Sequence, residues 1–130
     1  KAIAEQMMNG GQKHLSGSVA RILREANSDK ALPYILQQLR NPQLGIPVKT
    51  ALLRGFGGWL KDRSVQDRQE GTAVLRDIVT NDKERWMRYF AVQSLSEMGK
   101  NEETTTFFLG LKEKEGDEFV QSAIDRYLKL

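Results

Sequence analysis

Residues 82–99 have the sequence DKERWMRYFAVQSLSEMG, in which a helix start, an apolar face and a helix stop follow one another. Asn81-Asp82 has the composition of a turn and an N-cap, and Gly99 suits the position just after a helix end. Between these signals, apolar side chains recur at helical spacing: Met87, Phe90, Ala91, Leu95 and Met98. This stretch therefore predicts an amphipathic helix whose apolar face must be covered by neighbouring helices.

Weaker copies of the same pattern on both sides group into three antiparallel helix pairs. We expect these pairs at residues 29–62, 63–100 and 101–130, preceded by one or two further helices within residues 1–28. The most strand-like run, 104–109, follows a capping residue and continues with a helical period, so we expect it to be helical as well. The chain 1–130 is thus predicted to be a single all-α domain. Because it starts without Met and ends inside an expected helix, we expect it to be part of a longer protein.

The second helices of the three pairs align with one another. Val48, Met87 and Val120 fall in register, at steps of 39 and 33 residues. Two-helix repeats have periods of this size, and several must stack because one pair alone cannot bury both of its faces. We also expect the last helix to bury Val120 and Tyr127, with Phe119 beside them. The alignment predicts a stack of helix pairs, an α-solenoid.

The middle pair resembles a HEAT-like repeat. In that family an Asp in the turn lies six residues before a basic residue of the second helix, and an apolar residue directly precedes the basic one. Asp82, Met87 and Arg88 match this pattern, and the small and Leu positions that follow are filled by Ala91 and Leu95. The resemblance implies a right-handed α-solenoid of about three antiparallel helix pairs. It also implies that Asp82 and Arg88 are structural and tie the turn to its helix and to the next repeat. The alternative is that Asp82 is only an N-cap and Arg88 a solvated residue.

The other two pairs match the HEAT-like pattern only in part. The first has Lys49 at the basic position but Gln43 where the Asp is expected. The last has Glu115 and Gln121 at the two positions. The resemblance therefore rests mainly on one repeat.

The bulk composition narrows the possible classes of protein. Of the 130 residues, 39% are hydrophobic and 28% are charged, which is typical of a globular domain, and the mean hydropathy of −0.53 predicts no membrane insertion. The chain has no Cys and one His, His14, in the Gly-rich stretch 10–17, where we expect a loop. Ordinary zinc and copper sites and thiol nucleophiles are thereby excluded, and we expect no cofactor. The compartment stays open, with the cytoplasm slightly favoured.

The charge is distributed unevenly along the chain. Residues 1–66 carry ten Lys/Arg against four Asp/Glu, whereas residues 67–130 carry ten against thirteen. A basic half of this kind can bind an acidic partner or a nucleic-acid backbone, although no nucleic-acid motif is present. The expected basic patch consists of Arg54, Lys61 and Arg63.

Two features could indicate catalysis, and each has a simpler structural interpretation. Trp59 and Trp86 lie beside basic residues, as do aromatic residues of some HEAT-like DNA glycosylases, but no motif is matched. We therefore expect both tryptophans to be structural, in the core or at a junction between repeats. The segment 55–58, Gly-Phe-Gly-Gly, lacks the Gly-Lys-Ser/Thr of a phosphate-binding loop. It predicts either an early helix end or the close approach of another backbone.

The function that this pattern favours is binding without catalysis. We expect a scaffold or adaptor domain that holds a protein or peptide on the exposed face of the second helices. The expected partner-binding residues are Lys49, Arg85, Arg88, Gln93, Gln121 and Asp125. Three alternatives stay open: nucleic-acid-backbone binding through the basic half, a structural C-terminal domain of a larger enzyme, and a HEAT-type DNA glycosylase or pigment lyase.

Overall fold

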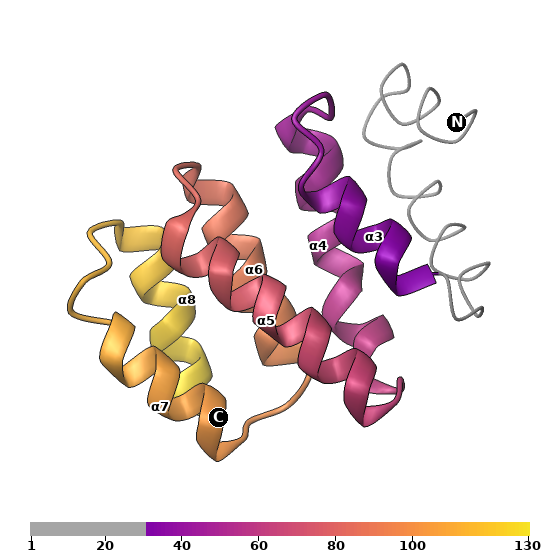
Figure 1. Ribbon diagram of the computed structural model, residues 1–130. Helices are drawn as coiled ribbons and strands as arrows, with labels where there is room; N and C mark the ends of the chain where they lie inside the picture. Colours follow the sequence, from indigo (N-terminus) through magenta and orange to yellow (C-terminus); the bar gives the residue numbers. More distant parts are fainter. Residues whose placement is uncertain (1–30) are drawn as a thin grey trace.

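The computed structural model describes residues 31–130, and this part of the chain is entirely helical (Figure 1). Its helices are α3 (Ala31–Leu39), α4 (Ile46–Lys61), α5 (Val65–Asn81), α6 (Arg85–Glu97), α7 (Glu102–Leu111) and α8 (Glu118–Leu128). Between residues 31 and 130 there is no strand, which confirms the all-α class there, the 104–109 segment included. The helices expected within 1–28, and His14 with its Gly-rich stretch, lie outside the described residues. Among the helices of 31–130, none is both long and apolar enough to cross a membrane.

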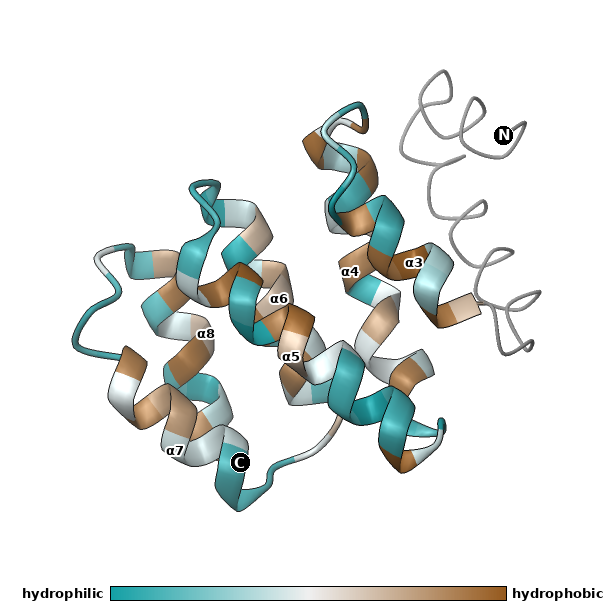
Figure 2. Cartoon of the chain, in the orientation of Figure 1, coloured by the Kyte–Doolittle hydropathy of each residue, from teal (hydrophilic) through white to brown (hydrophobic). Residues whose placement is uncertain are grey.

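The helices lie in two layers. Helices α4, α6 and α8 are the second members of the expected pairs, and α6 packs against α4 on one side and against α8 on the other. Helices α3, α5 and α7 lie in front of them in Figure 1, and α3 also contacts α5. Brown and teal bands alternate along the helices in Figure 2, because each helix has one apolar and one polar face. The order along the layer of second helices is therefore α4, α6, α8.

Side-chain caps define where three of the helices begin. The Ser64 hydroxyl accepts a hydrogen bond from the backbone N–H of Asp67 at the start of α5, at 3.1 Å. The Asn101 side chain accepts from the N–H of Thr104 at 2.8 Å, and Asp117 accepts from the first N–H groups of α8. These oxygens satisfy N–H groups that the first helical turn leaves unpaired. The start of α8 is thus fixed by a charged cap.

The predicted N-cap role of Asp82 is wrong. The N-cap of α6 is Glu84, which makes no side-chain cap hydrogen bond, and Asp82 instead ends α5 through its backbone N–H to the Ile78 carbonyl. Its carboxylate accepts from the N–H of Glu84 at 2.8 Å, inside the turn. At the other end of α6, Gly99 has φ +95°, the left-handed conformation predicted for it. Asp82 therefore shapes the turn between the two helices.

Helices α4 and α6 approach each other very closely. At Gly57 an added Cβ would meet the backbone carbonyl group of Ser94, whose carbonyl carbon would lie 2.7 Å away. The Ser94 hydroxyl donates to the Leu53 carbonyl across the same crossing. Of the two possibilities that the sequence left open for 55–58, close backbone approach is correct and an early helix end is wrong, since α4 continues to Lys61. Because Gly57 has no side chain, α4 and α6 can approach each other at short range.

Candidate functional site

Arg88 is held by three contacts rather than exposed for binding. Its Nη1 donates to the Asp82 carbonyl at 2.9 Å, and its Nε and Nη2 donate to the two carboxylate oxygens of Glu115 at 3.0 and 3.3 Å. The side chains of Arg88 and Glu115 are only 16% and 6% exposed. Arg88 thus ties the α5–α6 turn to α6 and to the loop before α8, which favours the structural role over partner binding.

The α7–α8 turn repeats part of this arrangement. The Gln121 side-chain amide donates to the Glu115 carbonyl, as Arg88 does to the carbonyl of Asp82. The Glu115 carboxylate accepts from the backbone N–H of Asp117 at 3.0 Å, as the Asp82 carboxylate does from the N–H two residues on. Glu115 and Gln121 therefore make the contacts of Asp82 and Arg88, although their residue types differ. Gln121 is engaged within its own turn.

The remaining expected partner-binding residues lie in different settings. Lys49 is half-buried on α4. Asp125 on α8 forms an ion pair of 2.8 Å with Lys112, between two exposed side chains. Arg85 donates to the Asp117 carboxylate, and Gln93 lines a pocket between α6 and α8. Arg85 belongs to a surface feature of the second helices, and the pocket at Gln93 adjoins that feature.

That feature is a cluster of four aromatic rings with three arginines on the layer of second helices. We call it the aromatic–arginine patch, and it consists of Arg54 of α4, Arg85, Trp86, Tyr89 and Phe90 of α6, and Phe119 and Arg126 of α8. The ring of Trp86 is the hub: its centroid lies 5.5 Å from those of Tyr89 and Phe119 and 6.3 Å from that of Phe90. Rings at such separations attract one another beyond their area of contact.

Two rings of the patch are open to solvent. The side chains of Trp86 and Phe119 are 41% and 48% exposed. The prediction that Phe119 lies with the buried residues of the last helix is therefore wrong: Val120 is buried, and Phe119, one position earlier, lies about 100° away around the helix. Trp86 does contact a ring of the following helix pair, but it lies on the surface of this junction and not in the core. Trp59, by contrast, is half-buried and stacked on Phe56 at 6.0 Å, as a structural residue would be.

Each arginine of the patch covers one aromatic ring. The guanidinium carbons of Arg54 and Arg85 lie 5.1 Å from the centroids of Phe90 and Phe119, respectively. Arg126 lies 5.8 Å from the centroid of Tyr89 and donates to its hydroxyl at 2.9 Å. Such cation–π contacts hold long side chains in place on a surface. The three arginines are therefore ordered parts of the patch.

The three arginines differ in their charge environment. Arg85 is neutralised by Asp117, whereas neither Arg54 nor Arg126 has an acidic partner among residues 31–130. Desolvation raises the pKa of Asp117, but the hydrogen bond from Arg85 and those from two backbone N–H groups outweigh it and hold this pKa below its ordinary value. The patch thus carries an excess of positive charge at Arg54 and Arg126.

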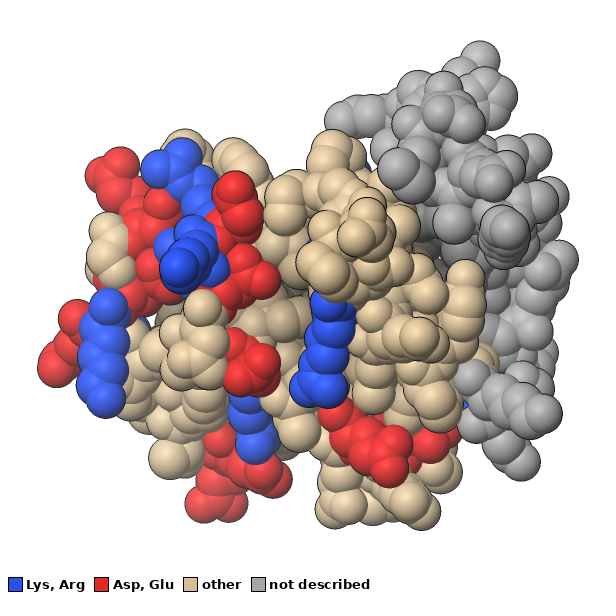
Figure 3. Space-filling model, turned by 45° about the horizontal axis from the view of Figure 1, so that its top comes forward, with Lys and Arg blue, Asp and Glu red and all other residues tan. Residues whose placement is uncertain are grey.

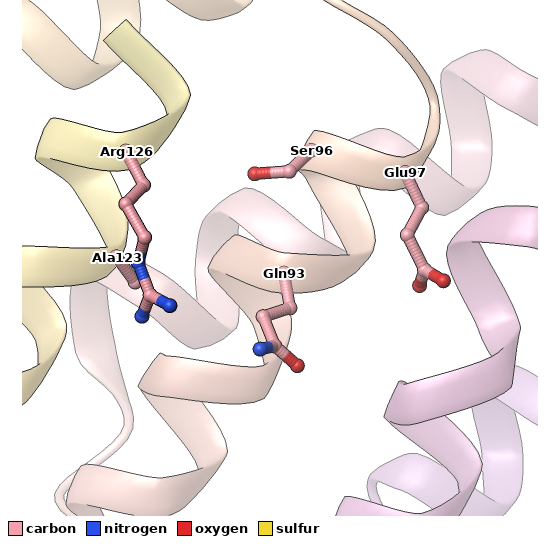
Figure 4. Close-up of a pocket in the computed structure, with 5 residues that line it drawn as sticks. All are labelled: Gln93, Ser96, Glu97, Ala123 and Arg126. Carbon is pink, nitrogen blue, oxygen red and sulfur yellow. The ribbon is translucent and has the colours of Figure 1, made fainter. Parts of the chain in front are cut away.

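A pocket of about 330 Å³ adjoins the patch, between α6 and α8. Figure 4 shows Gln93, Ser96 and Glu97 reaching it from α6, and Ala123 and Arg126 from α8, with Gln93 between Arg126 and Glu97. Burial raises the pKa of Glu97. Arg126 is a member of the aromatic–arginine patch and also lines this pocket.

The members of the expected basic patch differ in their surroundings. Arg63 pairs with Asp67 at 3.1 Å and covers the ring of Trp59, with its guanidinium carbon 4.9 Å from the centroid. Arg54 belongs to the aromatic–arginine patch, and of the three only Lys61 stands as a simple exposed cation. On the face drawn in Figure 3, acidic and basic side chains interleave over the α7–α8 end. That face offers no continuous field of one sign.

A second pocket, of about 360 Å³, lies between α5 and α7. Its wall includes Arg76, which pairs with Glu103 at 2.8 Å and covers the ring of Phe107. This ion pair neutralises the charge of Arg76, and Arg68, which also lines the pocket, donates to the Arg63 carbonyl. Within residues 31–130, no group of three His, Asp or Glu side chains could hold a metal ion.

Sequence reasoning missed most of the aromatic–arginine patch. Trp86, Tyr89 and Phe90 share one side of α6 at spacings of three and four residues, next to the buried side. Phe90, expected on the buried side with Met87 and Ala91, is only half-buried. The sequence signal for this part of the patch was thus a second row of apolar residues along α6. The contribution of Phe119 and Arg126 could not be read from spacing, because it depends on how α8 lies against α6.

Comparisons with known proteins give no relative for this chain: no family model, no curated protein and no solved structure matches it.

Proposed function

We propose that this protein is a non-catalytic interaction domain that binds a protein or peptide on the exposed side of its second helices, α4, α6 and α8. The observation that carries the proposal is the aromatic–arginine patch, in which Trp86 and Phe119 are open to solvent. Trp, Tyr and Arg are the residues most enriched at the energetic centres of protein interfaces. An exposed cluster of them marks an interaction surface more strongly than single exposed apolar residues do.

The proposal includes a right-handed α-solenoid of HEAT-like helix pairs. The side-by-side order of α4, α6 and α8 supports it, as do the matching contacts of Arg88 and Gln121 in successive turns. In a stack of this kind, the second helices form one extended surface, to which each pair contributes. The patch draws residues from all three second helices, as a binding site on such a surface would.

Affinity capture tests this function. The tagged chain is incubated with lysate of its source cells, with and without nuclease, beside a Trp86→Ala/Phe119→Ala variant. Tyr34→Ala is the matched control, because Tyr34 lies on α3 and its side chain is 41% exposed, like that of Trp86. Circular dichroism establishes that each variant stays helical.

We expect a protein that survives nuclease treatment, is retained by the Tyr34 variant and is lost by the double variant. Recovery that disappears with nuclease would instead favour nucleic-acid binding. Equal recovery by all three chains would contradict a binding role for the patch. Capture of nothing would favour a structural domain of a larger protein.

A further inference from the structure

We infer that the partner presents an acidic segment with an apolar anchor, whose carboxylates pair with Arg54 and Arg126 while the anchor packs on Trp86 and Phe119. This inference rests on the proposed function and adds the chemistry of the ligand. It follows from which groups of the aromatic–arginine patch are still free to meet a partner.

The aromatic faces of the patch are largely occupied by the protein itself. Arg54 covers Phe90, Arg85 covers Phe119 and Arg126 covers Tyr89, at guanidinium-to-centroid distances of 5.1, 5.1 and 5.8 Å. Single-stranded nucleic acid binds by stacking its bases on open ring faces. With a guanidinium over one face of three of the four rings, the patch is better suited to groups that meet guanidinium N–H donors than to a run of stacked bases.

The charge of the patch is complementary to carboxylates. Arg54 and Arg126 are exposed, and within the described residues neither has an acidic partner. A guanidinium held over a ring is restricted in position and keeps N–H donors for the oxygens of a carboxylate, although Arg126 already donates from Nη2 to the Tyr89 hydroxyl. Two such cations are too few for a polyanion that needs many phosphate contacts. They suffice for a short segment that contains Asp or Glu.

The adjoining pocket determines where the acidic groups can lie. Arg126 forms one wall and Glu97 stands beyond Gln93, so a carboxylate is attracted at the Arg126 side and repelled at the Glu97 side (Figure 4). The rings of Trp86 and Phe119, whose centroids lie 5.5 Å apart, are the most exposed of the patch, although Arg85 covers one face of Phe119. The ligand therefore places an apolar side chain there and its carboxylates toward Arg54 and Arg126.

A selection from a displayed library of random peptides tests this chemistry, with the whole chain as target. Binders are recovered on the unaltered protein and then measured by fluorescence anisotropy on three variants. These are Arg54→Gln/Arg126→Gln, Trp86→Ala, and the control Arg40→Gln, which removes an exposed arginine outside the patch. A random single-stranded DNA oligonucleotide is measured in parallel. Circular dichroism again shows that each variant is folded, and Trp86→Gln replaces Trp86→Ala if the latter is not.

We expect selected peptides to combine Asp or Glu with Leu, Phe or Trp. The double arginine variant should weaken their binding roughly three- to tenfold, the Trp86 variant about tenfold or more, and the Arg40 variant not at all. Peptides that need Trp86 but show no acidic bias and no loss with the arginine variant would overturn the acidic ligand while leaving the proposed function intact. Absence of any Trp86-dependent peptide would count against both. Tighter binding of the oligonucleotide through the same residues would replace the acidic peptide by nucleic acid.

Discussion

Arg88 on α6 and Glu115 in the loop before α8 form a two-point ion pair, with Nε–Oε1 at 3.0 Å and Nη2–Oε2 at 3.3 Å, almost shielded from solvent. The same guanidinium donates to the Asp82 carbonyl. One side chain thus connects two successive turns of the fold. The energetic consequences can be measured separately from any binding function.

Replacing Arg88 by Met should lower the free energy of unfolding by about 3 kcal/mol, because it leaves the Glu115 carboxylate buried without its partner. Urea unfolding measures the change. The double variant Arg88→Met/Glu115→Gln should recover a substantial part of the loss, since no unpaired charge then remains. A loss below about 1 kcal/mol for Arg88→Met would place the pair among ordinary surface ion pairs and contradict its structural role.

Neighbouring glycines of α4 should respond in opposite directions to Ala. Gly57→Ala should destabilise by about 1–3 kcal/mol, because its Cβ would overlap the Ser94 backbone. Gly58→Ala meets no atom within 4 Å and should stabilise the helix by up to about 1 kcal/mol. Thermal or urea unfolding of the two variants provides the comparison. Equal effects of the two substitutions would show that α4 and α6 do not approach closely at Gly57.

The Asp117 cap should make stability fall in acid. Its lowered pKa means that the charged form favours the folded state, so its contribution is complete above the ordinary aspartate pKa of about 4. That contribution is lost as the pH falls through the folded-state pKa. Asp117→Asn should therefore be less stable than the unaltered chain at pH 7, and the difference should shrink as the solution is acidified from about pH 5 to pH 2. A difference independent of pH would contradict the role of the charge.

Exposed and buried aromatic residues should differ strongly in their effect on stability. Phe108 is fully buried against Tyr127, with ring centroids 4.9 Å apart, so Phe108→Ala should cost about 3–5 kcal/mol. Phe119→Ala should cost about 1 kcal/mol or less, since half of the side chain already faces water. Unfolding in urea measures both. A large loss for Phe119→Ala would mean that the patch serves folding instead of recognition.

Much of the helical framework could be predicted from the sequence, because caps and apolar periodicity act locally. The predicted helix stop at Gly99 is confirmed by its left-handed conformation, and Asn101 and Asp117, residue types preferred as N-caps, begin α7 and α8. The close approach at Gly57 was one of two possibilities, since a run of glycines does not state what lies against it. The backbone that Gly57 approaches is that of Ser94, which lies 37 positions further along the chain and could not be identified from the local sequence.

The candidate site could be predicted far less well, for a physical reason. Arg88 and Gln121 are polar residues at plausible exposed positions. Both are nevertheless used within the fold, because each donates to a backbone carbonyl of a turn and Arg88 also pairs with a carboxylate. Conversely, Phe119 is large and apolar, as core residues are, yet it lies on the surface. Which polar groups remain available depends on contacts between helices, and helical spacing within one segment does not contain that information.

Photo-crosslinking tests the central claim, that the exposed side of α4, α6 and α8 receives a protein partner, most directly. A photoreactive phenylalanine analogue is placed at Trp86, or at Tyr34 of α3 as the equally exposed control, and the cells of origin are irradiated. The account predicts a discrete protein adduct from position 86, absent from position 34 and reduced in yield by Arg54→Gln/Arg126→Gln. Adducts of equal yield at both positions, or none from position 86 in a folded and expressed chain, would contradict it.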